Sequence, residues 1–238
     1  MRWIRYINEA ANWFYMNGGR LSVPVVFWGI INRGGEQAAQ HSQAIHSMFA
    51  HVPGLKVVMP ASPYDAKGLM ISAIKDENPV VFIDDRWLYG TEGIVPKDPY
   101  EVPIGEARIR RSGKDVTIAA TSYMVELVLD ASDHLSERGL DVEVIDLRTI
   151  KPLDKATLIN SVKKTGKLVV ADGGWKSFGV SAEIEAVVVE EAFRELKAPP
   201  IRVTLPDVPA PAARSLEKAY YPTKENVITA VLNCINYR

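Results

Sequence analysis

The chain has 238 residues, with 28 basic and 29 acidic side chains and a formal net charge of −1. This balance excludes the strongly basic surface of a nucleic-acid or anionic-membrane binder, and no stretch approaches the roughly 20 apolar residues that span a bilayer. Because Cys234 is the only cysteine, an internal disulfide framework is excluded, and we expect a protein of the cytoplasm or, in a eukaryote, of the mitochondrial matrix.

The first half of the chain predicts a helix, three strands and a second helix. Apolar residues at helical spacing predict an N-terminal helix that ends at Gly18-Gly19; they are Ile4, Ile7, Ala11 and Phe14. Apolar runs typical of parallel strands covered on both faces follow at 23–27, 55–59 and 80–83. Between the last two runs, Ser62 precedes Pro63, so we expect it to cap a helix over 62–74.

This half is unusual for a complete domain. Three strands are fewer than the about five or six of an average sheet. The first helix is rich in aromatic residues, namely Trp3, Tyr6, Trp13, Phe14 and Tyr15. We therefore expect the first half to expose apolar surface that another chain or segment would cover. The alternative is a small domain that the second half of the chain completes.

A connection containing Pro96, Pro99 and Pro103 leads to a second series of elements. Its strands are predicted at 116–120, 142–145, 168–171 and 201–204. Its helices are predicted at 123–137, 155–164, 179–194 and 224–235. Because the α/β alternation restarts, we predict an α/β protein of two domains, residues 1–95 and 113–238, joined by a linker at 96–112.

The strongest candidate for a catalytic residue is His41, within Gln40-His41-Ser42-Gln43. It follows an irregular segment containing Gly29, Gly34 and Gly35, so we expect it at the carboxyl end of a strand, where open α/β sheets bind ligands. Imidazole exchanges protons near neutral pH, which suits acid–base catalysis. On spacing alone, a hydrogen-bonded structural histidine is the alternative. We interpret His46, in a short helix, and His51, in a Pro-Gly turn, as structural.

Several ordered segments resemble the β subunit of the thiamine-diphosphate-dependent E1 component of 2-oxo acid dehydrogenase complexes, of the pyruvate type. These segments are 17–19, 23–27, 38–43, 51–58, 65–69, 78–81, 144–154, 173–179 and 207–211. The resemblance covers essentially the whole chain in order. It implies part of a transketolase pyrimidine-binding-type domain followed by a transketolase C-terminal-type domain.

The resemblance also implies an α2β2 enzyme that decarboxylates a 2-oxo acid and passes the acyl group to a lipoyl group on an E2 core. The α subunit would hold the diphosphate of the cofactor and its Mg²⁺, and the C-terminal domain would support a β–β homodimer. On this resemblance, His41 matches the family histidine that faces the reacting carbon. Gln40 resembles pyruvate- and acetoin-type members more than branched-chain members.

Two further sites follow from the resemblance. A potassium site built largely from backbone carbonyls would map onto Val25, Ala73, Ile74, Asp76 and Asn78. The alternative at 76–79 is an ordinary Asp-Glu-Asn-Pro helix stop. The resemblance also implies that 173–175, Gly-Gly-Trp, forms a turn at a subunit contact.

Departures from the family pattern bear on what the chain can do alone. The family glutamate and stacking aromatic residue that bind the aminopyrimidine ring would align upstream of Met1, so they match no position here. Residues 28–36 replace the usual loop before the histidine, and Lys197 stands where some members carry an acidic residue used in E2 docking. Two functions therefore compete: an E1 β subunit that is inactive as an isolated chain, and a noncatalytic transketolase-like assembly module.

Overall fold

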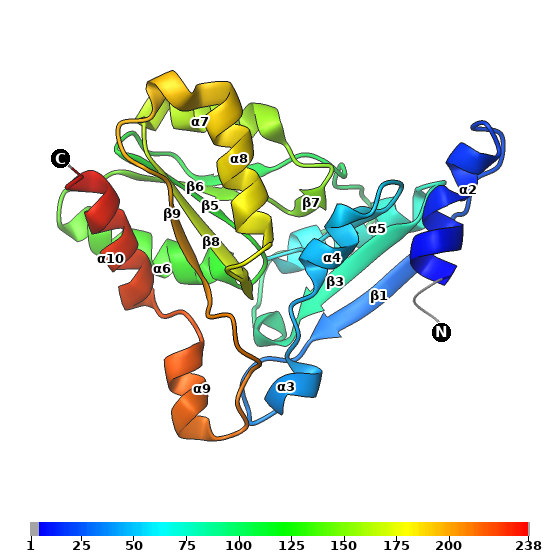
Figure 1. The fold of residues 1–238 in the computed structure, drawn as a ribbon, viewed down its shortest axis with the longest axis horizontal. Coiled ribbons are helices and arrows are strands. Elements are labelled where there is room, and N and C mark those ends of the chain that lie inside the picture. Colours follow the sequence, from blue (N-terminus) through cyan, green and yellow to red (C-terminus); the bar gives the residue numbers. More distant parts are fainter. Residues whose placement is uncertain (1–4, 238) are drawn as a thin grey trace.

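The computed structural model describes residues 5–237, which form two α/β halves with one sheet each (Figure 1). The chain begins with a π-helix, η1 (Arg5–Ala10), that continues into α2 (Ala11–Met16). Gly18 and Gly19 then adopt left-handed backbone angles, with φ of 61° and 76°, so the helix ends where the sequence predicts. Trp3 and Ile4, which the sequence assigns to this helix, lie outside the described residues.

The first sheet has the strand order β1-β3-β2-β7. Its parallel strands are β1 (Val26–Ile31), β2 (Lys56–Val58) and β3 (Val80–Asp85). The fourth strand, β7 (Thr149–Lys151), comes from the second half of the chain and pairs antiparallel with β2. The sheet therefore has four strands where the first half predicted three, because the second half contributes one.

The position of β1 corrects the strand predicted at 23–27. The strand starts at Val26 and continues through Trp28 and Gly29, which the sequence placed in the irregular segment before His41. Each residue of β1 pairs with β3, from Val26 opposite Val80 to Ile31 opposite Asp85. Pairing with a distant strand thus overrides the local signal of Gly29.

The remaining helices of the first half follow the predicted order. Helix α5 (Pro63–Lys75) is capped by Ser62, whose Oγ accepts a hydrogen bond from the Asp65 N–H at 3.1 Å. Two short helices, α3 (Ala38–His41) and α4 (His46–His51), lie between β1 and β2. His51 is therefore the last residue of α4 and not part of the predicted turn, because the extended backbone begins only at Val52.

The second sheet has the order β4-β6-β5-β8-β9, with β4 antiparallel to β6 and the other pairs parallel. The strands are β4 (Arg108–Arg111), β5 (Val116–Ala120), β6 (Val142–Asp146), β8 (Leu168–Trp175) and β9 (Ile201–Leu205). The helices are α6 (Met124–Glu137), α7 (Lys155–Thr165), α8 (Val180–Ala192), α9 (Arg214–Tyr220) and α10 (Lys224–Ile235), with two 3₁₀ turns, η2 (Arg86–Leu88) and η3 (Phe193–Glu195). The sequence predicted most of these elements but not β4, β7 or α9.

Helices cover both faces of the second sheet (Figure 1). Ile118 of β5 packs in the same core cluster as residues of α6 and α10, whereas its neighbour Ala119 packs with residues of α7 and α8. Successive strand residues point to opposite faces, so this alternation places the two helix pairs on opposite sides. Because helices cover both faces, ligands can approach the sheet at the ends of its strands, and the carboxyl ends are where open α/β sheets bind ligands.

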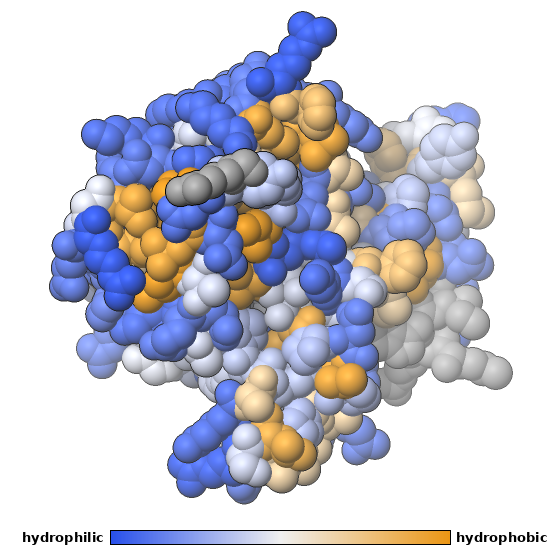
Figure 2. Space-filling model, turned by 60° about the vertical axis from the view of Figure 1, so that its left-hand side comes forward, coloured by the Kyte–Doolittle hydropathy of each residue, from blue (hydrophilic) through white to orange (hydrophobic). Residues whose placement is uncertain are grey.

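Apolar side chains remain on the surface of the first half, as we expected from its aromatic helix. Those of α2 and β1 that are between 40% and 87% exposed are Trp13, Phe14, Tyr15, Met16, Trp28 and Ile30. Figure 2, which turns the side of α10 toward the reader, shows apolar areas separated by hydrophilic ones. Within residues 5–237, no helix combines the length and the apolar character needed to cross a lipid bilayer.

Candidate functional site

His41 ends α3, just after the carboxyl end of β1. Its side chain is exposed. The main-chain N–H of Asn32, which directly follows β1, donates to the carbonyl of His41 at 3.0 Å and ties the short helix to the strand end. His41 therefore lies where the sequence predicted, and its catalytic role stays a prediction.

The loop between β1 and α3 has an unusual backbone. Gly34, Gly35, Glu36 and Ala38 all have a positive φ, between 58° and 66°. Non-glycine residues rarely adopt this conformation, and it persists only where surrounding contacts hold it. Both carboxylate oxygens of Glu217, in α9, accept hydrogen bonds from the Glu36 N–H, at 3.0 and 3.1 Å. The second half of the chain thus holds the loop that carries His41.

A buried ion pair lies at the base of this loop. Arg33 Nε donates to Asp85 Oδ2 at 2.5 Å, and both side chains are fully buried. The Arg33 guanidinium also lies 4.7 Å from the ring centroid of Tyr123. Burial alone would lower the pKa of Arg33, but the Asp85 carboxylate and the neighbouring Tyr123 raise it. Arg33 therefore stays charged and joins the ends of β1 and β3.

A second buried pair connects the two halves. His46 Nε2 lies 3.0 Å from Asp172 Oδ1, and Thr121 Oγ1 donates to the same carboxylate oxygen at 2.7 Å. Burial would raise the pKa of Asp172, but the interactions with His46, Thr121 and Arg33 lower it. His46 is thus engaged inside the protein, which agrees with its structural interpretation.

Gly173 and Gly174 follow Asp172 within β8, so they lie in a strand and not in the predicted turn, and the predicted subunit contact stays a prediction. A Cβ on Gly173 would lie 2.6 Å from the Tyr123 ring and 2.8 Å from Arg33 Nη2. A Cβ on Gly174 would lie 2.8 Å from Asp172 Oδ2. The two glycines therefore allow β8 to approach the buried pairs of the first half.

These residues form an inter-half cluster of Arg33, His46, Asp85, Thr121 and Asp172. Sequence reasoning named His46 alone and missed its partners. Asp85 ends β3, and Asp172 lies toward the carboxyl end of β8. A polar residue at the end of an apolar strand is the signal that could have found both carboxylates.

The residues expected to bind potassium lie at the amino ends of β1 and β3 and at the end of α5. The Val25 carbonyl accepts a hydrogen bond from the Val80 N–H at 3.0 Å, and Asp76 Oδ1 accepts one from the Asn78 N–H at 2.9 Å. Ala73 and Ile74 precede Asp76 in the last turn of α5. The Lys56 ammonium contacts Asp76 Oδ2, so a cation already faces this carboxylate. The His, Cys, Asp and Glu side chains of residues 5–237 form no group of three or more suited to a metal ion.

Comparison with known families and structures identifies the architecture. Residues 3–91 match the family described as "Transketolase, pyrimidine binding domain", and residues 105–227 match "Transketolase, C-terminal domain". A solved structure titled "Split gene transketolase, inactive beta4 tetramer" matches with a TM-score of 0.76 at 24% identity, covering 96% of this chain and 73% of that one. These findings confirm the predicted fold class.

Known proteins are similar over nearly the whole chain. The Pyruvate dehydrogenase E1 component subunit beta of Rickettsia felis is 48% identical over 97% of this chain and 71% of that protein. The mitochondrial subunit of that name from Bos taurus is 46% identical over 97% of this chain and 66% of its own. The Acetoin:2,6-dichlorophenolindophenol oxidoreductase subunit beta of Cupriavidus necator is 44% identical over 94% of this chain and 66% of its own.

Proposed function

Because the chain belongs to the family of pyruvate dehydrogenase E1 component β subunits, we propose that it pairs with an α subunit in a thiamine-diphosphate-dependent enzyme. This enzyme decarboxylates pyruvate or a similar 2-oxo acid oxidatively and transfers the acyl group to a lipoyl group on E2. The observation that carries the proposal is the 48% identity over 97% of the chain. The 44% identity to an acetoin-type subunit favours acetoin as a second candidate substrate.

We assign proton transfer to His41. When bound, thiamine diphosphate, with its Mg²⁺ held by the α subunit, supplies the nucleophilic carbon that 2-oxo acid decarboxylation requires. The exposed imidazole of His41 fits a site beside such a cofactor because it can reach a bound ligand, whereas His46 is occupied by Asp172. His41 would give a proton to the lipoyl sulfur, or take one from it, through an imidazole nitrogen. No residue within 5–237 is assigned to the aminopyrimidine ring or to the diphosphate.

The rest of the site orients His41. Glu217 holds the left-handed loop through the Glu36 N–H, and the Arg33–Asp85 pair fixes the base of that loop. Rigid support from buried pairs keeps a catalytic group in one position. The proposed catalytic loop therefore depends on contacts from both halves of the chain.

Reconstitution tests the proposal. The chain would be combined with its cognate α subunit, thiamine diphosphate, Mg²⁺ and lipoyl-bearing E2, and kcat/KM compared for pyruvate, acetoin and a branched-chain 2-oxo acid. We expect the highest value for pyruvate. A preference for acetoin would favour the second candidate. Complex formation without turnover of any substrate would favour the noncatalytic assembly module.

We also propose that the chain forms a β–β homodimer and binds an α subunit, in the cytoplasm or the mitochondrial matrix. The exposed aromatic residues of α2 and β1 support this, because surface of that kind is commonly covered in an assembly. Sedimentation velocity at micromolar concentration, with and without the α subunit, measures the assembly. A monomer that the α subunit leaves unchanged would contradict it.

We propose that Val25, Ala73, Ile74, Asp76 and Asn78 bind potassium, with Asp76 shared between the ion and Lys56. Carbonyl oxygens at the end of a helix lie at its negative pole and suit a hard cation. Replacing NaCl by KCl at equal ionic strength should raise the melting temperature, and Asp76→Asn should remove the difference. If the wild type responds equally to both salts, the Lys56 ammonium alone serves this carboxylate.

A further inference from the structure

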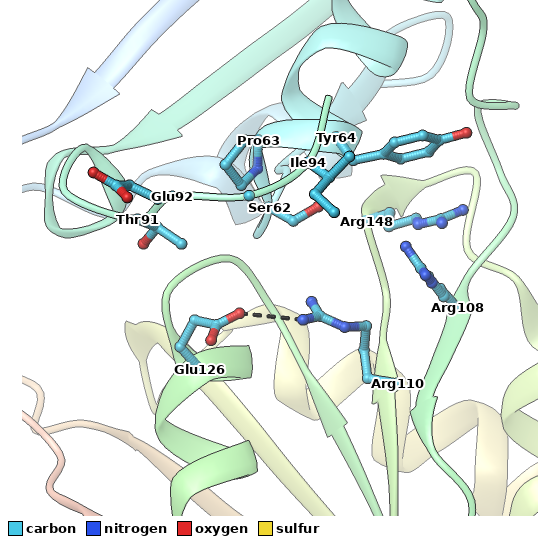
Figure 3. A pocket seen from close by; sticks show the side chains of 11 residues that line it. Ser62, Pro63, Tyr64, Thr91, Glu92, Ile94, Arg108, Arg110, Glu126 and Arg148 are labelled. Carbon is cyan, nitrogen blue, oxygen red and sulfur yellow. Dashed lines mark hydrogen bonds and ion pairs between the residues drawn. The ribbon is translucent and has the colours of Figure 1, made fainter. Parts of the chain in front are cut away.

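A cavity of about 510 Å³ lies between the two halves, lined by α5 and residues 91–94 on one side and by β4 on the other (Figure 3). Its lining is mainly polar and includes Ser62, Tyr64, Arg108, Arg110, Glu126 and Arg148. None of the residues assigned above to the proposed reaction lines it. Its volume lies within the range of about 300–1,000 Å³ typical of small-molecule sites.

Three arginines reach this cavity from two segments. Arg108 and Arg110 both line it from β4, where the register with β6 is irregular between Ile109 and Arg111. Arg148 comes from the connection between β6 and β7. Figure 3 shows the guanidinium groups of Arg108 and Arg148 pointing toward the same part of the cavity. Positive charges that line one cavity attract an anion.

The acidic side chains near these arginines do not satisfy all of the arginine N–H donors. Arg148 Nη2 lies 3.0 Å from Asp65 Oδ1, but Arg148 is only 9% exposed and its Nε has no hydrogen-bond partner. Arg110 Nη2 lies 3.4 Å from Glu126 Oε1, and its Nη1 lies 3.6 Å from Asp146 Oδ2, an ion pair without a hydrogen bond. Within residues 5–237, the side chain of Arg108 makes no hydrogen bond or ion pair. Because buried N–H groups are normally paired, the free Arg148 Nε indicates a ligand, and the exposed Arg108 guanidinium is available to the same ligand.

The backbone of Arg148 supports a functional role. Its φ is 56°, a left-handed conformation that a non-glycine residue rarely adopts. Two hydrogen bonds hold it there: its N–H donates to Asp146 Oδ1 at 3.0 Å, and its carbonyl accepts from the Met59 N–H at 2.7 Å. Such backbone strain concentrates at binding sites, where it aims a side chain.

The amino end of α5 adds a further attraction for negative charge. This helix has 13 residues, and Ser62, Pro63 and Tyr64 at its start line the cavity. The amino end of a helix carries partial positive charge and favours anions. Positive groups thus approach the cavity from α5, β4 and the β6–β7 connection.

We propose that this cavity binds a phosphorylated small molecule, with Arg108, Arg110 and Arg148 contacting its phosphate. Donors that converge from several directions suit the three oxygens of a phosphate better than the two of a planar carboxylate. A phosphate alone would fill a small part of about 510 Å³, so the remaining space accommodates the esterified portion.

Thermal unfolding of the full chain tests the proposal without any enzymatic turnover, so it stands apart from the proposed function. The probes are glycerol 3-phosphate, inorganic phosphate and succinate, each compared with NaCl at equal ionic strength. At about ten times its Kd, glycerol 3-phosphate should raise the melting temperature by about 3 °C or more. An equal rise with inorganic phosphate would assign the site to free phosphate and still support recognition of a phosphate group by the three arginines. A rise of the same size with succinate would overturn it.

Two matched variants locate the effect. Arg108→Gln removes an exposed, unpaired guanidinium, so the fold should remain intact while the affinity for glycerol 3-phosphate falls by about tenfold or more. Arg111→Gln is the control, because Arg111 lies on the same strand but pairs with Asp133 and does not line the cavity. Equal affinities in the wild type and both variants, measured by calorimetric titration, would overturn the proposal.

Discussion

His46 Nε2 of the first half lies 3.0 Å from Asp172 Oδ1 of the second half, and neither side chain is more than 1% exposed. These residues are 126 positions apart in the sequence. Thr121, which lies between β5 and α6, also donates a hydrogen bond to the Asp172 carboxylate. A buried carboxylate between two halves of a chain stabilises their relative position only while its partners are present.

Asp172→Asn should lower the free energy of unfolding by about 1.5–3 kcal/mol, because the hydrogen bonds from His46 and Thr121 to a buried carboxylate are lost or weakened. Asp133→Asn is the matched control: its Arg111 pair is exposed and should contribute about 0–1 kcal/mol. Denaturant titrations at neutral pH measure both. Equal losses in the two variants would contradict the role assigned to the buried pair.

Gly173→Ala should destabilise the protein by about 1–3 kcal/mol, because the added Cβ would lie 2.6 Å from the Tyr123 ring. Gly29→Ala provides the comparison: nothing lies within 4 Å of its Cβ position, and its φ is not positive. That variant should keep its stability or gain slightly. The midpoints of chemical unfolding of the two variants are compared. An unchanged midpoint for Gly173→Ala would show that β8 can shift away from the first half to accommodate the added Cβ.

His41→Ala should reduce acyl transfer to lipoyl groups by about 100-fold or more in the reconstituted enzyme, the usual scale for losing a positioned proton-transfer group. Cofactor affinity should change far less, because the side chain is exposed and is assigned to the reacting group. Steady-state assays and cofactor titration measure the two effects. His51→Ala, which changes an exposed histidine at the end of α4, is the control. Near-normal acyl transfer by His41→Ala would show that His41 is a structural and not a catalytic residue.

Asp146→Asn should change the pH dependence of stability. Burial and the nearby Asp65 raise the pKa of Asp146 to about 7, against the opposing effect of Arg110 and Arg148. A carboxyl group whose folded pKa is raised stabilises the folded state while protonated, and this contribution is lost as pH rises through the folded value.

The loss begins near the unfolded value of 3.8 and is complete above about 7, so the stability of the variant relative to the wild type should increase between pH 5 and pH 8. Melting temperatures at these two pH values provide the test. Asp130→Asn, at a partly exposed pair with Lys224, should give the same small difference at both. If Asp146→Asn also shows no change between the two pH values, the carboxyl group of Asp146 is ionised throughout.

The types and order of many elements could be read from the sequence, because helical and strand periodicities are carried by neighbouring residues. The last helix, Lys224–Ile235, and the strand Val116–Ala120 have the predicted bounds. The local motif also placed His41 at the carboxyl end of a strand. The ordered family segments likewise predicted the fold class.

Only the tertiary structure decided the features that depend on distant partners. The end of β1 is set by pairing with β3, and β7 joins the first sheet although it belongs to the second half of the sequence. The Arg33–Asp85 pair joins residues 52 positions apart, and no local pattern marks either as the partner of the other. Position 173 has no room for a side chain, because Tyr123 and Arg33 pack against Gly173. Local periodicity determines what each segment forms, whereas packing between segments determines which polar groups become buried together and therefore where a site can arise.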